Sequence, residues 1–105
     1  MWVLKTITEG FPEKTFRILP GVMRTIGRST GADFILDAAL VSRVHCRLTV
    51  LNTGELEIRD LKSTNGTFVN DKRVEKATLS AGDRLRVGRV ELTINVASGS
   101  PMADG

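Results

Sequence analysis

The chain has 105 residues, of which 41% are hydrophobic and 26% are charged, as is ordinary for a single globular domain. The formal net charge is only +3, from 15 Lys and Arg residues against 12 Asp and Glu residues, so charge alone does not predict a nucleic-acid partner. Cys46 is the only cysteine, which excludes an intrachain disulfide and a multi-thiolate metal site and favours a small buried apolar residue.

The two ends of the sequence differ in character. The first ten residues, MWVLKTITEG, lack the apolar segment of a signal peptide, and no apolar run is long enough to span a bilayer. We therefore expect an intracellular protein without a membrane partner, cytoplasmic or, in a eukaryote, nuclear. Residues 98–105 are small, polar and without pattern, which predicts a disordered tail or linker after a domain over residues 1–97.

Short alternations of apolar and polar residues, separated by turn residues, predict strands along the chain. In chain order, the first strands are expected over residues 2–8, 15–19, 23–27 and 33–36. No stretch predicts a helix of convincing length, and no internal repeat is present.

Two hairpins can be read with their register. Across the turn at residues 52–54, Leu48 and its apolar neighbours meet Ile58, while Arg47 shares the outer face with Arg59. A tighter hairpin closes Val87 onto Val90 around Gly88-Arg89, so that Leu85 faces Leu92 and Arg86 faces Glu91. About ten such strands predict an all-β fold, a single-domain antiparallel β-sandwich whose binding loops lie at one end.

Three predicted loops are rich in groups that bind phosphate: residues 27–33, 40–46 and 62–67. Arg28 offers a planar guanidinium that can hold two phosphate oxygens, and Ser42 and Thr64 offer hydroxyls. The Asn65 amide carries both donors and an acceptor, so it can pair with a peptide N–H and C=O together. These residue types predict a site for a phosphorylated peptide.

The order of the three motifs resembles the forkhead-associated (FHA) domain: Gly27-Arg28, then Ser42-Arg43-Val44-His45, then Ser63-Thr64-Asn65-Gly66-Thr67. The resemblance covers roughly residues 2–97 and implies an eleven-stranded sandwich that binds phosphothreonine-containing proteins or peptides as a signalling adaptor. It also implies a monomeric domain, alone or within a larger protein, that needs no cofactor or metal.

The same resemblance implies a role for each site residue. Arg28, Ser42 and Thr64 would hold the phosphate and Asn65 the peptide main chain, with assistance from Arg43. Ser29 is a further candidate, and Ser63 is an alternative to Thr64 if the loop shifts by one residue. Leu40 either reads the third residue after the phosphothreonine or turns into the core. Three residues are expected to be structural: Gly27, His45 and Gly66.

Other function classes find less support in the sequence. A Ser-His hydrolase is disfavoured because the Ser42–His45 spacing comes without a G-x-S-x-G motif. A nucleic-acid binder lacks an aromatic stacking platform, since the chain has four Phe, one Trp and no Tyr. A purely structural role, such as dimerisation, would leave the phosphate-binding motifs without a purpose. One departure from the family is Asp71 after Asn70, which predicts a longer or slightly strained turn.

Overall fold

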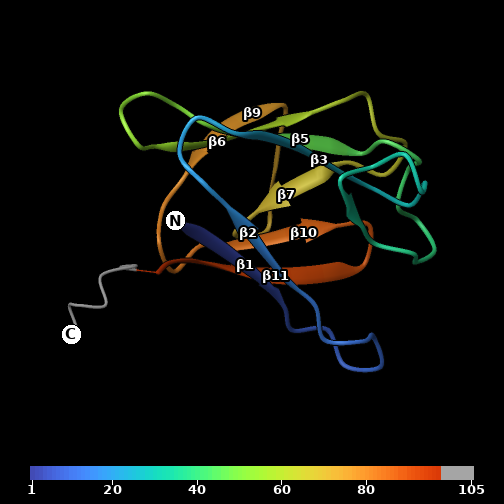
Figure 1. Ribbon diagram of the computed structural model, residues 1–105. Coiled ribbons are helices and arrows are strands. Elements are labelled where there is room, and N and C mark those ends of the chain that lie inside the picture. The colour runs from blue at the N-terminus through green and yellow to red at the C-terminus, as the bar shows by residue number, and fades with distance from the viewer. Residues whose placement is uncertain (98–105) are drawn as a thin grey trace.

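The computed structural model describes residues 1–97, and within them it contains eleven strands and no helix (Figure 1). The strands form two sheets packed face to face, so the predicted all-β sandwich is confirmed. The tail predicted over residues 98–105 lies outside the described residues.

The first sheet has six strands, in the order β2 (Thr15–Ile18), β1 (Trp2–Thr6), β11 (Val90–Val96), β10 (Arg84–Val87), β7 (Thr67–Val69) and β8 (Lys72–Val74). The second has five strands, in the order β4 (Phe34–Ile35), β3 (Met23–Gly27), β5 (Cys46–Val50), β6 (Leu56–Asp60) and β9 (Lys76–Leu79). All neighbours are antiparallel, as predicted for the sandwich, except β3 and β4, which pair in parallel at one edge of the second sheet. The first, second and fourth strands are also shorter than predicted.

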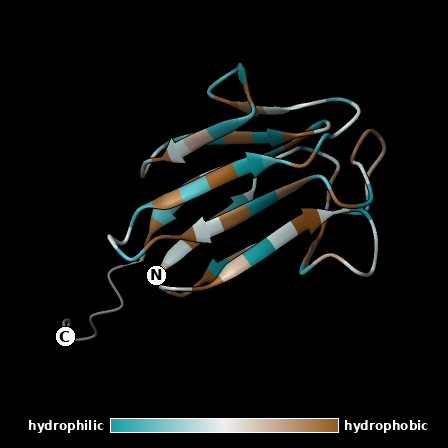
Figure 2. Cartoon of the chain, turned by 90° about the horizontal axis from the view of Figure 1, so that it is seen from above, coloured by the Kyte–Doolittle hydropathy of each residue, from teal (hydrophilic) through white to brown (hydrophobic). Residues whose placement is uncertain are grey.

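Both predicted hairpins have the predicted register. Leu48 lies opposite Ile58 in the β5–β6 pair. In the β10–β11 pair Leu85 lies opposite Leu92 and Arg86 opposite Glu91. Figure 2 shows the cause as bands of opposite hydropathy that alternate along the strands. Because successive side chains point to opposite faces, a shift by one residue would expose the apolar set to water.

The core lies between the two sheets. Buried apolar side chains come from both of them, among them Leu4, Leu48, Ile58, Leu85 and Leu92, each with no exposed surface. Cys46 is buried among them, as its sequence context predicts, and this burial raises the pKa of its thiol far above the ordinary value. Phe16 and Phe34, from edge strands of the two sheets, stack with their ring centroids 4.5 Å apart and close one side of the sandwich.

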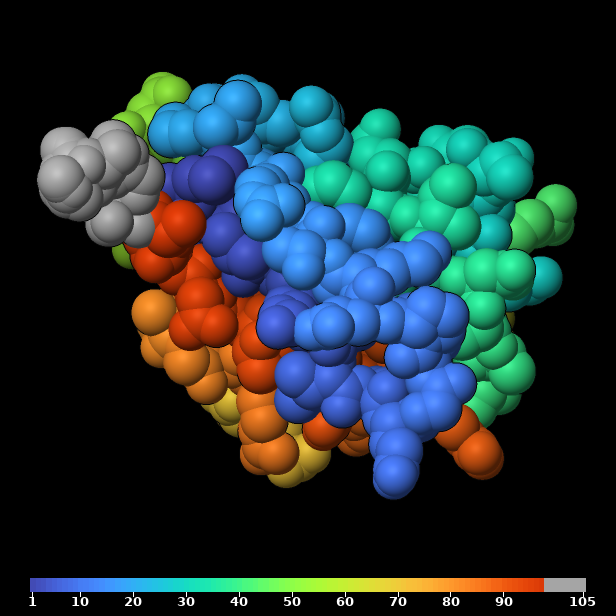
Figure 3. All heavy atoms as spheres, turned by 60° about the horizontal axis from the view of Figure 1, so that its bottom comes forward, coloured from blue at the N-terminus to red at the C-terminus, as the bar shows by residue number. Residues whose placement is uncertain are grey.

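The ends of the described chain lie together. β1 pairs with β11 from Trp2 opposite Val96 to Thr6 opposite Leu92, and Figure 3 shows the N-terminal segment in blue beside the C-terminal strand in red. The loops β3–β4, β4–β5 and β6–β7 gather at the opposite end, on the right in Figure 1. The topology therefore brings together the three loops in which the phosphate-binding residue types occur.

The turn between β7 and β8 consists of two residues, since Val69 pairs with Lys72. Asn70 and Asp71 both have positive φ, 50° and 70°. Of the two alternatives stated for this turn, the longer loop is wrong: the turn keeps two residues, with Asp71 at a positive φ that Gly adopts more easily. The Asn70 amide supports the turn by accepting from the Arg84 N–H at 2.9 Å and donating to Asp83.

Candidate functional site

Three loops surround one concavity at the loop-bearing end, which we call the loop concavity. Its lining comes from the β3–β4, β4–β5 and β6–β7 connections, namely Arg28, Asp37, Ala38, Ala39, Leu40, Val41, Ser42, Thr64 and Asn65. Four residues that the sequence predicts to contact a phosphopeptide therefore line the same hollow: Arg28, Ser42, Thr64 and Asn65.

Gly27 explains why the first motif begins with glycine. A β-carbon at Gly27 would lie 2.0 Å from the carbonyl oxygen of Arg43, a separation that no side chain can tolerate. This close approach allows the β3–β4 and β4–β5 loops to bond directly: Arg28 N–H donates to Ser42 C=O at 2.9 Å, and Ser29 N–H to Arg43 C=O at 3.1 Å. Glycine is therefore required at position 27 because a side chain would not fit, and not because of its backbone conformation, since its φ is not in the left-handed region.

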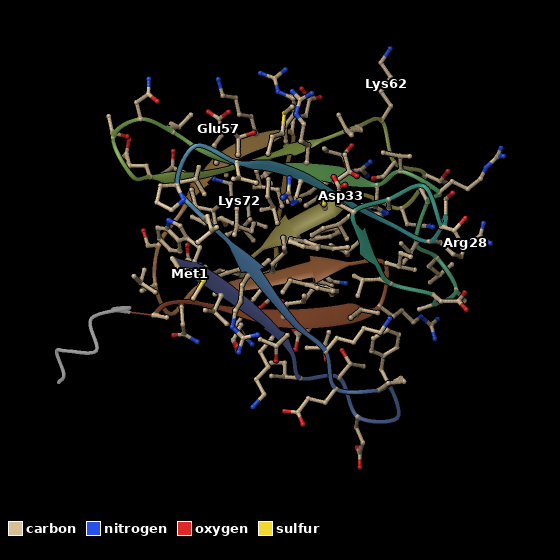
Figure 4. The ribbon with its side chains drawn as sticks, viewed as in Figure 1. Met1, Arg28, Asp33, Glu57, Lys62 and Lys72 are labelled. Carbon is tan, nitrogen blue, oxygen red and sulfur yellow. The ribbon has the colours of Figure 1, made fainter. Side chains whose placement is uncertain are left out.

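The Arg28 side chain is exposed but held at one atom. Its Nε–H donates to the Val41 carbonyl at 3.0 Å, which orients the guanidinium at the edge of the loop concavity. Within residues 1–97 Arg28 has no carboxylate within ion-pair distance. The terminal nitrogens thus remain available for an anion at the loop-bearing end, where Figure 4 labels this residue.

The β3–β4 loop is tied back to its own strand by Asp33, which Figure 4 also labels. One Asp33 carboxylate oxygen accepts from the Thr25 N–H at 2.9 Å and from the Thr25 hydroxyl at 3.2 Å. The backbone bond in particular holds the pKa of Asp33 below its ordinary value. The loop that carries Arg28 is thereby closed at its far end.

His45 joins the other two loops from beneath. It has no exposed surface; its Nδ1 accepts from the Ser42 N–H at 3.0 Å, and its Nε2 lies 2.8 Å from the Gly66 carbonyl. Since a backbone N–H must donate to Nδ1, and a carbonyl can only accept, these partners select the neutral tautomer with the proton on Nε2. Both ring nitrogens are thus committed to the backbone.

Ser42 and Thr64 meet across the two loops. The Ser42 hydroxyl oxygen accepts from the Thr64 N–H at 3.1 Å, which leaves the Ser42 hydroxyl proton free to donate. The Asn65 amide donates to the Leu40 carbonyl at 3.1 Å, which leaves its oxygen and a second N–H for another partner. Thr64 and Asn65 are exposed and Ser42 is half-buried. These three side chains form a continuous polar wall.

Asp60, at the end of β6, organises the loop that carries Thr64 and was not singled out from the sequence. Its carboxylate accepts from the hydroxyls of Ser63 and Thr67 and from the Ser63 N–H. Partial burial raises the pKa of Asp60, but these hydrogen bonds outweigh it and hold the pKa below the ordinary 3.8. Its position three residues before a Ser, where Asx-type turns form, is the local signal that could have identified it.

The structure distinguishes Ser63 from Thr64. Ser63 is buried, and its hydroxyl donates to Asp60 and accepts from the Gly66 N–H at 2.9 Å. Ser63 is therefore turned away from the loop concavity, and the prediction that Thr64 contacts the phosphate keeps Thr64 as its residue. Gly66 has a φ of 90°, which favours glycine and provides the bend at the end of the Thr64 loop.

Leu40 faces outward. It is 43% exposed and lines the loop concavity, so the alternative in which it turns into the core is wrong. Its φ of 71° is unusual for a residue other than glycine, and the bond from the Asn65 amide supports it. Gly88 lies close to its backbone, since a β-carbon there would come within 2.9 Å of the Leu40 carbonyl.

Two other candidates do not line the loop concavity. The Ser29 hydroxyl accepts from the Gly31 N–H at 3.0 Å and so serves its own turn. Arg43 contributes its backbone to the contact with Gly27, while its exposed side chain is absent from the lining. Asp37, in contrast, does line the loop concavity although it was not a predicted site residue.

Residues 1–97 contain no group of three or more His, Cys, Asp or Glu side chains arranged to hold a metal ion. In the same described part of the chain, no helix has the length and apolar character needed to cross a membrane.

Comparison with known proteins agrees with this architecture. The family model described as "FHA domain" matches residues 24–88. An ABC transporter ATP-binding/permease protein of Mycobacterium tuberculosis is 44% identical over 78 residues, which cover 74% of this chain and 9% of the transporter. This chain also spans less than half the length of two further curated relatives, 47% and 41%.

Solved structures give the same assignment. The FhaA FHA domain, complexed with the intracellular domain of Rv3910, is 30% identical with a TM-score of 0.80, over 90% of this chain and 100% of that one. EmbR of Mycobacterium tuberculosis, in complex with a low-affinity phosphopeptide, is 30% identical with a TM-score of 0.78, over 94% of this chain and 25% of that one. The chain therefore belongs to the FHA domain family.

Proposed function

We propose that this domain is a phosphothreonine-dependent peptide-binding module that acts as a signalling adaptor, with its ligand in the loop concavity. The observation that carries the proposal is the environment of the Arg28 side chain: its Nε–H is held by the Val41 carbonyl, and no carboxylate among residues 1–97 lies within ion-pair distance of its guanidinium. A phosphate ester with a charge near −2 and three acceptor oxygens matches this guanidinium and the hydroxyls beside it.

Each polar residue of the wall has a distinct part in the proposal. Arg28 pairs with the phosphate, and Ser42 and Thr64 donate their hydroxyl protons to it. Asn65 holds the peptide main chain just after the phosphothreonine through the amide atoms that Leu40 leaves free. Arg43, which does not line the loop concavity, assists only through its long exposed side chain.

The proposed role is binding without catalysis, cofactor or metal. It is supported by His45, whose two ring nitrogens contact backbone groups and which therefore does not serve as a base for the Ser42 hydroxyl. EmbR, in complex with a phosphopeptide, supports the ligand class. We propose a monomeric module within an intracellular protein, where kinases supply phosphothreonine, and a protein rather than nucleic acid or membrane as its partner.

Calorimetric titration with a matched pair of peptides, identical except for phosphate on one threonine, tests the proposal. The phosphorylated peptide is expected to bind and the unphosphorylated peptide to give no measurable heat. A phosphoserine version serves as the control for threonine dependence. Equal affinity for the phosphorylated and unphosphorylated peptides would refute a phosphate-dependent site.

Variants of Arg28 locate the site. Removing one member of a close charge pair costs about 2–5 kcal/mol, so Arg28→Ala should weaken binding about thirtyfold or more. Arg28→Lys should restore only part of the affinity, because an ammonium group cannot hold two oxygens in a planar fork. The exposed Arg28 side chain supports no core, so both variants should keep the wild-type melting temperature. Normal binding by Arg28→Ala would place the site elsewhere.

A further inference from the structure

A second concavity lies on the other side of the β6–β7 loop, and we call it the cationic concavity. Its lining comes from β6, the residues after β6, β8 and the start of β9. Four of its lining residues are cationic: Arg59, Lys62, Arg73 and Lys76. The net charge of only +3 conceals this local concentration.

The cations continue across the outer face of the five-stranded sheet. Arg47 on β5 lies directly opposite Arg59 on β6, and Arg59 lies directly opposite Lys76 on β9. Like charges in directly opposed positions of a sheet repel each other and destabilise the pairing. Only Lys76 has an acidic partner, Glu57 at 3.5 Å. Within residues 1–97 the two arginines have none, so a bound anion would relieve the repulsion in this row.

Asp60 and Glu75 also line the cationic concavity, so its four cations and two carboxylates leave a formal net charge of +2. The Asp60 carboxylate accepts hydrogen bonds from the Ser63 and Thr67 hydroxyls, as described above, and within residues 1–97 it forms no ion pair with a cation. Glu75 is exposed and is paired with no cation in the described part of the chain. Arg73 and Lys62 are exposed and likewise have no carboxylate partner in that part of the chain. The surface is therefore open to an external anion.

The two concavities share one wall. Ser63 lines the cationic concavity and the next residue in the chain, Thr64, lines the loop concavity, so the two linings meet at adjacent residues. Lys62, with a φ of 58°, starts this wall. Figure 4 shows Lys62 projecting beyond the five-stranded sheet and Arg28 at the same end of the molecule, pointing in a different direction. One extended ligand can therefore contact both surfaces.

We propose that the cationic concavity binds an acidic segment of the same partner protein, on the N-terminal side of the phosphothreonine. This inference rests on the proposed function, which gives the ligand its direction. In this proposal Asn65 and Leu40 contact the residues that follow the phosphothreonine, and the residues that precede it cross the shared wall at Ser63 and Thr64. An acidic peptide fits better than single-stranded nucleic acid, because no aromatic side chain for base stacking lines the cationic concavity.

Three phosphothreonine peptides of equal length test the inference by calorimetry. One is neutral around the phosphothreonine, one carries three Glu residues before it, and one carries the same three residues after it. Three exposed charge contacts should strengthen binding of the N-terminally acidic peptide about three- to a hundredfold over the neutral peptide. The gain should shrink when the salt concentration is raised. An equal gain from acidic residues on either side would overturn the inference.

Charge-matched variants separate a local surface from a general attraction. Arg59→Gln/Arg73→Gln should abolish the gain and leave the affinity for the neutral peptide unchanged. Arg17→Gln/Lys72→Gln, with the same net charge, changes exposed residues that do not line the cationic concavity and should keep the gain. If the first double variant folds poorly, Lys62→Gln replaces it, and this variant should reduce the same gain in affinity. Equal losses in both double variants would overturn the inference.

Failure of the proposed function has a different signature. If the neutral phosphopeptide binds but the N-terminal Glu residues add nothing, the inference is wrong and the phosphothreonine site stands. If no phosphopeptide binds at the loop concavity, an unphosphorylated acidic peptide should still shift the amide resonances of β6 and β9 in wild type but not in Arg59→Gln/Arg73→Gln. Tighter binding of a single-stranded oligonucleotide at these same resonances would assign the surface to nucleic acid and overturn the inference.

Discussion

Replacing His45 with Ala removes the side chain that joins the β4–β5 and β6–β7 loops without touching the proposed ligand. Two backbone groups lose their partners: the Ser42 N–H, now 3.0 Å from Nδ1, and the Gly66 carbonyl, now 2.8 Å from Nε2. The ring is fully buried, so its removal also leaves a void. We therefore expect a loss of stability first, and a loss of binding only as its consequence.

The size of the effect follows from these two groups. An unpaired buried donor or acceptor costs about 1–3 kcal/mol, so the pair contributes about 2–6 kcal/mol. The lower half of that range is expected, because the Ser42 N–H is only partly buried and can regain water. In a domain of about this size 1 kcal/mol corresponds to a melting-temperature shift of about 4–8 °C, so His45→Ala should melt about 10 °C lower or more.

Thermal unfolding and phosphopeptide titration of the same samples provide the measurement. His45→Asn is the graded control, because its side-chain oxygen can accept from the Ser42 N–H but cannot reach Gly66, and it should recover about 1 kcal/mol. Arg28→Ala should show the opposite pattern: a normal melting temperature with phosphopeptide binding weakened about thirtyfold or more. A His45→Ala protein that melts like wild type and yet binds nothing would make His45 a direct ligand and refute this reasoning.

Three further predictions concern the loops. Gly27→Ala should prevent stable folding or lower the melting temperature by more than 10 °C, because its β-carbon would overlap the Arg43 carbonyl; unchanged melting would contradict the contact. The pKa of Asp60 is lowered in the folded state, so its contribution to stability is complete above about pH 4 and is lost as pH falls through the folded pKa. Asp60→Asn should lower the free energy of unfolding by about 1.5–3 kcal/mol at neutral pH and reduce the loss of stability on acidification. An unchanged loss of stability at acid pH would exclude this role for Asp60. Because Leu40 is exposed in the loop concavity, the wild-type domain should prefer peptides with Ile, Leu or Val over Asp at the third residue after the phosphothreonine. Leu40→Arg should shift this preference toward Asp. A wild-type preference for Asp among peptides that differ only at that residue would contradict the prediction.

Local pattern was sufficient for the two hairpins. Leu48 opposite Ile58 and Leu85 opposite Leu92 follow from the period of two along each strand, because only one register buries both apolar sets. The parallel β3–β4 pair could not be predicted in this way. The two residue pairs, Ile26 with Phe34 and Gly27 with Ile35, carry too little pattern to specify an orientation.

Part of the candidate site can likewise be predicted from the sequence, and part depends on the tertiary structure. The sequence by itself indicates the residue types and their order, from Arg28 through Ser42 to Thr64 and Asn65, because these are the side chains whose chemistry suits a phosphopeptide. That their loops surround one concavity depends on a strand order that places residues far apart in the chain at one end of the sandwich.

Only the tertiary structure decides between neighbouring residues within each loop. Ser63 and Thr64 offer the same hydroxyl chemistry, but Asp60 at the end of β6 holds Ser63 inward, and Thr64 is left exposed. Leu40 is apolar and would suit the core, but its left-handed backbone and its bond from Asn65 turn it outward. In both cases a hydrogen bond to another part of the fold fixes the loop, through the side chain at Ser63 and through the backbone carbonyl at Leu40, and no property of the residue itself specifies that bond.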